Sequence, residues 1–201
     1  MARTVEFDRE EVQRKAMGVF WQDGYCKCSI SSLVNATRLQ PGSIYAAFNS
    51  KEGLFLAALE YYGQQSIKKL QSYLDGADTP LQGVRIFIEK IGETILGGGE
   101  QRGCFLVNTV LELSPGKATV NADVNKYLGA IESLIYSALV AAQDQGELLA
   151  GQSPDVLAKY LMVNIWGLQV LAKTNPDNDS VKAVLDQILA SLQGQEAARG
   201  L

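Results

Sequence analysis

Apolar residues recur at helical spacing through most of the chain, and residues that favour helix ends separate the runs. Near the N-terminus they fall on one helical face at Val12, Ala16, Val19 and Phe20. Asp8 is suited to cap the start of this helix and Gly24 to end it. A second, shorter run from Ile30 to Val34 follows Ser29, which is another N-cap residue. The pattern therefore predicts two helices in quick succession.

The stretch Pro41–Phe48 predicts a third helix of about two turns. Proline is tolerated in the first turn of a helix because the N–H that it lacks has no partner there. The apolar face of this helix comprises Ile44, Ala47 and Phe48, and its outer face carries Gly42, Ser43, Tyr45 and Ala46. Ser50 is predicted to cap the next helix. Since helices this short are unstable alone, the third helix must pack on its neighbours.

A short helix, a tight turn and a second short helix that begins with small residues match a helix-turn-helix. In that motif the N-terminal part of the second helix enters the major groove of DNA. Small outer residues such as Gly42 and Ala46 would let the backbone approach the duplex closely. The pattern thus predicts a DNA-binding module over residues 1–55.

The rest of the chain, residues 56–201, is predicted to form longer amphipathic helices punctuated by prolines. The expected fold is all-α, with a three-helix helix-turn-helix module followed by a larger helical domain. The most apolar stretch, Tyr160–Ala172, is shorter than the ~20 residues that a bilayer requires. It is therefore predicted to be a buried helix, and no membrane partner is expected.

The segment SISSLVNATRLQPGSIYAAFNSKEGLFLAAL, from Ser29 to Leu59, resembles the DNA-binding module of the TetR (tetracycline-repressor-like) family of bacterial regulators. The matching residues are Ser29, Gly42–Phe48 and Ser50–Leu54. The segment Arg102–Pro115 is similar, more weakly, to one found in a subset of the family. The resemblance implies a homodimer that represses transcription from a palindromic DNA operator. It also implies a small-molecule inducer that binds in the C-terminal domain and releases the DNA.

The expected DNA contacts gather around the short third helix. The predicted residues are Ser29, Arg38, Gln40, Pro41, Gly42, Ser43, Tyr45, Ala46, Asn49 and Lys51. Tyr45 can hydrogen-bond a phosphate, and Lys51 lies at a helix start where free N–H groups also favour one. The alternative for these residues is an ordinary turn between helices and a solvated helix start.

The last two predicted helices are expected to form the dimer interface, because apolar residues cover a wide part of each. On the first they are Leu157, Leu161, Ile165, Leu168 and Val170, and on the second Val181, Val184, Leu185, Ile188, Leu189 and Leu192. A two-fold dimer is also what a helix-turn-helix needs to read two half-sites.

An inducer pocket would combine apolar walls with a few polar groups. The candidate lining residues are Phe87, Cys104, Phe105, Asn108, Tyr127, Met162 and Trp166. The alternative is that these residues only pack the core. For Cys104, the adjacent Arg102 and a helix start would make the thiol sensitive to oxidants or electrophiles. The alternative there is an inert core thiol.

Charge does not explain DNA binding by itself. The chain has 18 Lys and Arg against 22 Asp and Glu, a formal net charge of −4. Residues 1–60 contain seven basic and seven acidic residues, so the predicted module is neutral. This balance excludes a polycation that coats nucleic acid through its net charge. Contacts with DNA must therefore come from individual basic residues near the motif, such as Lys27, Arg38 and Lys51.

Other function classes find little support. Three cysteines do not suggest a disulfide framework, and the N-terminus lacks the apolar core of a signal peptide, so a reducing cytoplasm is expected. The chain has no His, so the pair Cys26 and Cys28 lacks further metal ligands. With no nucleophile elbow or phosphate-binding loop, no catalytic residues, metal or cofactor are expected. A helical scaffold or membrane-surface protein would leave the motif around Tyr45 unexplained.

Overall fold

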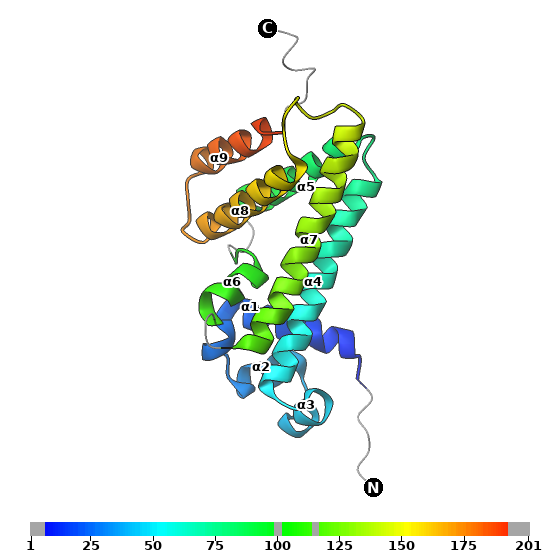
Figure 1. Cartoon of the computed structure of the whole chain (residues 1–201). Coiled ribbons are helices and arrows are strands. Elements are labelled where there is room, and N and C mark those ends of the chain that lie inside the picture. The colour runs from blue at the N-terminus through cyan, green and yellow to red at the C-terminus, as the bar shows by residue number, and fades with distance from the viewer. Residues whose placement is uncertain (1–6, 99–101, 114–116, 193–201) are drawn as a thin grey trace. The chain divides into compact units, whose positions relative to one another are not determined.

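The computed structural model describes residues 7–98, 102–113 and 117–192. Within these ranges the chain forms helices and no strand, which confirms the predicted all-α fold (Figure 1). The helices are α1 (Arg9–Lys27), α2 (Ile30–Thr37), α3 (Pro41–Phe48), α4 (Lys51–Asp75), α5 (Pro80–Leu96), α6 (Phe105–Leu113), α7 (Ala118–Asp144), α8 (Pro154–Ala172) and α9 (Asn178–Ala190). None of these helices combines the length and apolar character needed to span a membrane.

The helices begin where their capping residues predict. The Asp8 carboxylate accepts hydrogen bonds from the N–H groups of Glu10 and Glu11, at 2.9 and 3.2 Å. Ser29 and Ser153 cap α2 and α8 in the same way. These side chains satisfy N–H groups that have no partner inside the helix, so a cap fixes where each helix starts.

Gly24 interrupts helix α1 with a positive φ, as the sequence predicts for a residue that ends a helix, but a further helical turn follows it. Gly24 adopts φ 77° and ψ 166°, which bends the helix, and the chain then continues helically to Lys27. After the bend, the N–H groups of Tyr25 and Cys26 donate to the carboxylate of Glu112 on α6, at 2.9 and 2.8 Å. A carboxylate 86 residues further along the chain from Cys26 thus restarts the helix.

The chain divides into two compact units. The first takes the chain up to Gln65 together with Phe105–Leu128, and the second comprises Ser66–Cys104 and Gly129–Leu201. The predicted domain boundary at residue 55 therefore lies inside α4 and inside the first unit. α6 and the beginning of α7 belong to the same unit as the helix-turn-helix.

Aromatic residues fill the core of the first unit. Phe105 of α6 lies in edge-to-face contact with Phe55 and with Tyr62, at 5.7 Å between ring centroids in both cases. Phe20 of α1 lies edge-on to Phe55 at 4.9 Å. Trp21 packs against Tyr62 and Phe105. Since α1, α4 and α6 each contribute rings, α6 completes the core on which α2 and α3 depend.

The second unit packs α8 and α9 against α5, α7 and the end of α4. The apolar residues that the sequence assigned to a dimer face are mostly buried in this core: Leu157, Leu161, Ile165, Leu168, Val181, Leu185, Ile188 and Leu192. That part of the prediction is wrong, because these side chains pack within their own chain. Two residues of the predicted face, Val170 on α8 and Val184 on α9, are exposed, and Val156, Tyr160 and Val163 are exposed on the same side of α8 as Val170.

Candidate nucleic-acid interface

A turn of three residues connects α2 to α3 and fixes how the two helices meet. Arg38 adopts the left-handed conformation, with φ 63°, and its N–H donates to the Val34 carbonyl at 2.8 Å. Leu39 is buried, and its N–H donates to the Thr37 hydroxyl at 3.3 Å. Gln40 then precedes α3 and is exposed. A short turn with one residue in the left-handed region is the geometry of a helix-turn-helix.

Helix α3 has one buried and one open face. Ile44 and Phe48 are buried against the rest of the first unit. The exposed positions at its start and outer side are Pro41, Gly42, Tyr45 and Ala46, and Ser43 is half-buried. A Cβ atom added to Gly42 would meet nothing within 4 Å. The open face therefore consists of small residues and one tyrosine, as a helix that approaches DNA closely requires.

Ser29 and Asn49 lie at the ends of the two short helices. The Ser29 hydroxyl accepts from the Ser32 N–H at 3.0 Å and caps α2. Asn49 is exposed with φ 66°, and its N–H donates to the Tyr45 carbonyl at 2.8 Å. Both residues have a local structural role, and both remain predicted DNA contacts.

Lys51 has a partner that the sequence did not predict. Its ammonium donates to the Tyr25 carbonyl at 2.6 Å and lies 4.5 Å from the centroid of the Tyr25 ring. An ammonium has three N–H donors, so a phosphate contact remains open to the other two. The contact holds the first turn of α4 against the last turn of α1.

Lys117 lies on the same ring. Its ammonium donates to the Glu52 carboxylate and to the Tyr25 hydroxyl, and it lies 4.7 Å from the Tyr25 ring centroid. The hydrogen bond to Glu52, followed by the one to Tyr25, raises the pKa of Lys117. Tyr25, Glu52 and Lys117 were absent from the predicted site, because residues this far apart in sequence carry no local pattern.

The two cysteines beside Tyr25 differ in their surroundings. Cys28 is buried, and burial raises the pKa of its thiol to about 11. Cys26 is exposed, and a hydrogen bond to the Glu112 carboxylate raises the pKa of its thiol. Both thiols are therefore protonated at neutral pH, which does not favour thiolate chemistry at either.

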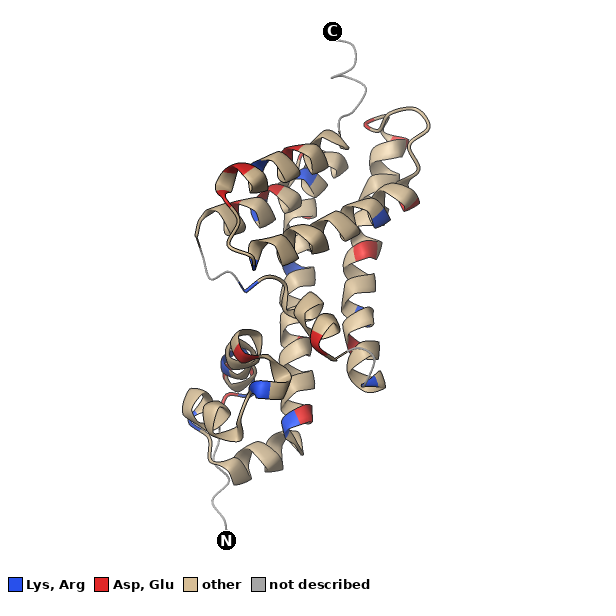
Figure 2. Cartoon of the chain, turned by 90° about the vertical axis from the view of Figure 1, so that its left-hand side faces the viewer, with Lys and Arg blue, Asp and Glu red and all other residues tan. Residues whose placement is uncertain are grey.

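Charged residues of both signs are interspersed along the helices of the first unit (Figure 2). Lys15 pairs with Glu11 at 2.8 Å, and Lys117 pairs with Glu52. This arrangement agrees with the neutral composition of residues 1–60. Few basic side chains of this unit are thus available for contacts with phosphates.

The predicted inducer-site residues fall in both units. Phe105, Asn108 and Tyr127 belong to the first unit, and Phe87, Cys104, Met162 and Trp166 belong to the second. Phe105 is part of the aromatic core already described. The ring of Tyr127 packs directly on Gly63, where an added Cβ would lie 2.3 Å from it. Met162 is buried in the core of the second unit. That these residues line one pocket remains a prediction.

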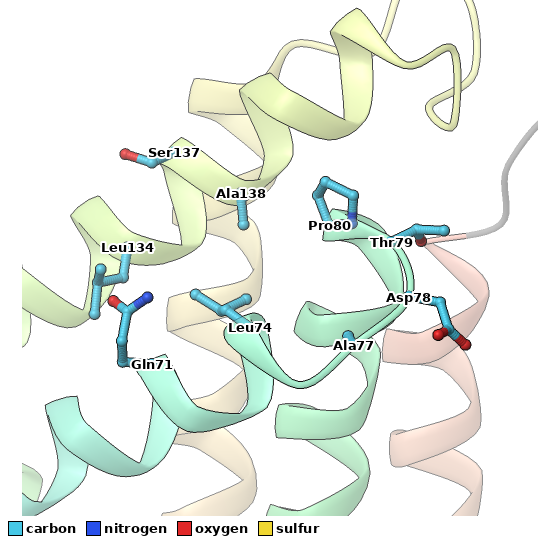
Figure 3. Close-up of a pocket in the computed structure, with 9 residues that line it drawn as sticks. All are labelled: Gln71, Leu74, Ala77, Asp78, Thr79, Pro80, Leu134, Ser137 and Ala138. Atoms are coloured by element: carbon cyan, nitrogen blue, oxygen red, sulfur yellow. The ribbon is translucent and has the colours of Figure 1, made fainter.

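A pocket of about 350 Å³ opens in the second unit (Figure 3). It is lined by Gln71, Leu74, Ala77, Asp78, Thr79, Pro80, Leu134, Ser137 and Ala138. These residues come from the end of α4, the connection from α4 to the first residue of α5, and the second half of α7. None of the predicted inducer-site residues is among them. Its volume lies at the lower end of the range for small-molecule sites.

The α2–turn–α3 geometry and the open face of α3 define a helix-turn-helix protein, and comparisons with known proteins agree. Residues 14–58 match the sequence profile of the bacterial regulatory proteins of the tetR family. Residues 80–188, more than half of the chain, match the tetracyclin repressor-like C-terminal domain. The chain belongs to the TetR family and is a transcriptional regulator, not an enzyme.

Similar proteins extend over most of the chain. The HTH-type transcriptional repressor ComR of Escherichia coli (strain K12) is 29% identical over 168 residues, which is 83% of this chain and 80% of ComR. The repressor DhaR of Mycobacterium sp. (strain GP1) is 24% identical over 193 residues, 96% of this chain and 94% of DhaR. A structure of the TetR-family regulator CifR with 26-base-pair operator DNA has a TM-score of 0.83 and 31% identity, and covers 94% of this chain and 99% of that chain.

Proposed function

We propose that this protein is a homodimeric repressor that binds a palindromic operator in the cytoplasm and is released by a small molecule. The open, small-residue face of α3 carries the DNA-binding part of this proposal. The similar proteins ComR and DhaR are repressors, which supports repression as the effect on transcription. CifR, which has a similar fold, is bound to double-stranded operator DNA in its structure, and this supports an operator as the DNA partner.

Within this proposal, Gly42, Ser43 and Ala46 face the base edges and Tyr45 contacts a phosphate. Lys51 and the N–H groups at the start of α4 hold a second phosphate. Ser29, Arg38, Gln40, Pro41 and Asn49 surround this centre. With so few basic contacts, each protomer binds weakly, and two protomers on one operator supply the affinity.

The exposed apolar face of α8 supports the dimer. Val156, Tyr160, Val163 and Val170 are spaced by four, three and seven residues, so they lie on one side of the helix. Gly167 lies on the same side, with open space where a Cβ would be. Val184 on α9 is also exposed. An apolar stripe of this kind suits a second copy of the same helix in a two-fold contact.

The inducer is proposed to bind in the part of the chain that follows the helix-turn-helix. Differential affinity of the inducer for the DNA-free state would shift the population away from the bound one. Of the predicted lining residues, those in the second unit, Phe87, Cys104, Met162 and Trp166, remain proposed.

A gel shift on the DNA that flanks the gene of this protein tests the proposal. The complex should be specific, palindromic in its footprint and much weaker at ~200 mM than at ~50 mM salt, because phosphate contacts release counterions. Failure both on this DNA and in selection from random sequences would remove the DNA-binding proposal. Sedimentation of the free protein as a monomer at micromolar concentration would remove the dimer.

A further inference from the structure

The C-terminal end of α3 is held from three directions. The N–H groups of Asn49 and Ser50 donate to the carbonyls of Tyr45 and Phe48, each at 2.8 Å. A Cβ added to Gly53 would lie 1.9 Å from the Phe48 carbonyl oxygen, so the first turn of α4 touches this end directly. The third direction is α1, through Arg9.

Arg9 contacts α3 in two ways. Its guanidinium Nη1 donates to the Ala47 carbonyl at 3.1 Å, across 38 positions of sequence. Its Cζ atom lies 4.5 Å from the centroid of the Phe48 ring. Phe48 itself is buried. One side chain thus binds both the backbone and the anchoring ring of the helix proposed to read DNA.

The electrostatics of the two helices explain this placement. Arg9 is the first residue of α1, where the helix dipole disfavours a cation. The same guanidinium lies at the C-terminus of α3, where the dipole favours one. The favourable interaction of the guanidinium charge with a helix dipole therefore comes from α3 and not from α1. Since α3 has eight residues and no side-chain cap at Gln40, external contacts must fix its orientation.

We infer that Arg9 is a positioning residue for DNA recognition: it holds α3 in the orientation that reads the operator. The inference rests on the proposed DNA-binding function and names a residue that this function requires. Arg9 acts on the end of α3 that is opposite to Gly42, so it sets the direction of the helix. The consequence is that Arg9 governs discrimination between operator and random DNA more than affinity for DNA in general.

A direct phosphate contact is the competing role, because Arg9 is exposed and has further N–H donors. The two roles differ in measurable ways. A phosphate contact contributes to the affinity for every DNA sequence. It also adds about one per protomer to the salt slope, which is the steepness with which the logarithm of the binding constant falls with the logarithm of the salt concentration. A positioning residue changes the ratio of operator to random-DNA affinity and leaves the salt slope unchanged.

The test compares Arg9→Ala and Arg9→Lys with Arg14→Ala. Arg14 is exposed on the same helix, so its variant is a matched loss of charge. Dissociation constants for the operator and for random DNA are measured between 50 and 200 mM salt, with urea unfolding as the check on folding. We expect Arg9→Ala to lower the operator-to-random ratio about tenfold, since a charged hydrogen bond and a cation–π contact are lost together. Arg9→Lys should fall between Arg9→Ala and wild type, and Arg14→Ala should keep the wild-type ratio.

Two outcomes would overturn the inference. In the first, Arg9→Ala keeps the wild-type ratio. In the second, both affinities fall together and the salt slope decreases, which would identify a phosphate contact. If Arg9→Ala does not fold, Phe48→Leu replaces it: this variant removes the ring under the guanidinium, and an unchanged ratio there would likewise contradict the inference. Absence of operator binding by the wild-type protein would instead refute the proposed function.

Discussion

Tyr45 and Lys51 lie on either side of the turn between α3 and α4, and each is proposed to contact a phosphate. Tyr45→Phe removes only a hydroxyl from an exposed side chain, so it should weaken operator and random DNA alike by about tenfold, the value of one hydrogen bond to a charged group. Lys51→Met should do the same and lower the salt slope by about one per protomer. Fluorescence anisotropy at several salt concentrations measures both.

Ser43 is the matched control for these two variants, because it faces the proposed base edges. Ser43→Ala should change which operator sequences are preferred and leave random-DNA affinity unchanged. Wild-type operator affinity in both the Tyr45 and Lys51 variants would mean that the phosphates lie elsewhere.

Because Cys28 is buried, the free energy of unfolding should depend on pH in the alkaline range. Its pKa of about 11 in the folded chain lies above the ordinary value of 9.0. Between these two values the unfolded chain releases a proton that the folded chain keeps, so the free energy of unfolding falls as pH rises. Urea unfolding at pH 8 and pH 10 should show a smaller fall for Cys28→Ala than for wild type. Equal falls would mean that the thiol ionises as readily in the folded state.

At the scale of single helices, replacing glycines by alanine distinguishes effects on stability from effects on DNA recognition. Gly18 in α1 and Gly42 in α3 both have open space where a Cβ would lie. Alanine at either position should raise the free energy of unfolding by about 0.5–1 kcal/mol, because it restricts the unfolded chain. Only Gly42→Ala should weaken operator binding, since its methyl group stands on the open face of α3. Unchanged operator affinity in Gly42→Ala would place the first turn of α3 away from the duplex.

Replacing Gly24 by alanine should have the opposite effect on the free energy of unfolding, because of the backbone conformation of Gly24. Its φ of 77° strains any other residue, and an added Cβ would lie 2.8 Å from a carboxylate oxygen of Glu112. Gly24→Ala should therefore lower the free energy of unfolding by about 1–2 kcal/mol. Urea unfolding measures both variants, and the change in the free energy of unfolding should be negative for Gly24→Ala and positive for Gly18→Ala. The same sign in both would show that the bend is not maintained in solution.

The helix starts and the bounds of α3 could be predicted from sequence because caps and prolines act within a few residues. The contacts of Arg9 with Ala47 and of Glu112 with Tyr25 could not, since they join residues 38 and 87 positions apart. The sequence also assigned buried residues of α8 such as Leu161 to the predicted dimer face, for another reason. That helix is apolar on more than one side, and only its packing partners decide which side is buried.

For the molecule as a whole, the exposed stripe on α8 determines the oligomeric state that we expect. Val163→Lys places a charge in the middle of this stripe and should convert the dimer to a monomer. Operator affinity should fall sharply, because one protomer reads only a half-site. Sedimentation velocity and gel shift measure the two effects. Leu111→Gln changes an exposed apolar residue on α6 and should alter neither mass nor affinity. A dimeric Val163→Lys protein would place the interface elsewhere.

The first unit is built from two separate stretches of chain, and this limits how such regulators are recombined. A chimera joined at residue 55 or 65 would take α1 to α3 from one parent and α6 from the other. The donor rings around Phe55 would then meet a foreign residue in place of Phe105, and Tyr25 would lose the carboxylate of Glu112. A functional graft must therefore carry residues 105–128 with it. For the same reason, these two stretches are expected to change together when the protein diverges, although the gene separates them.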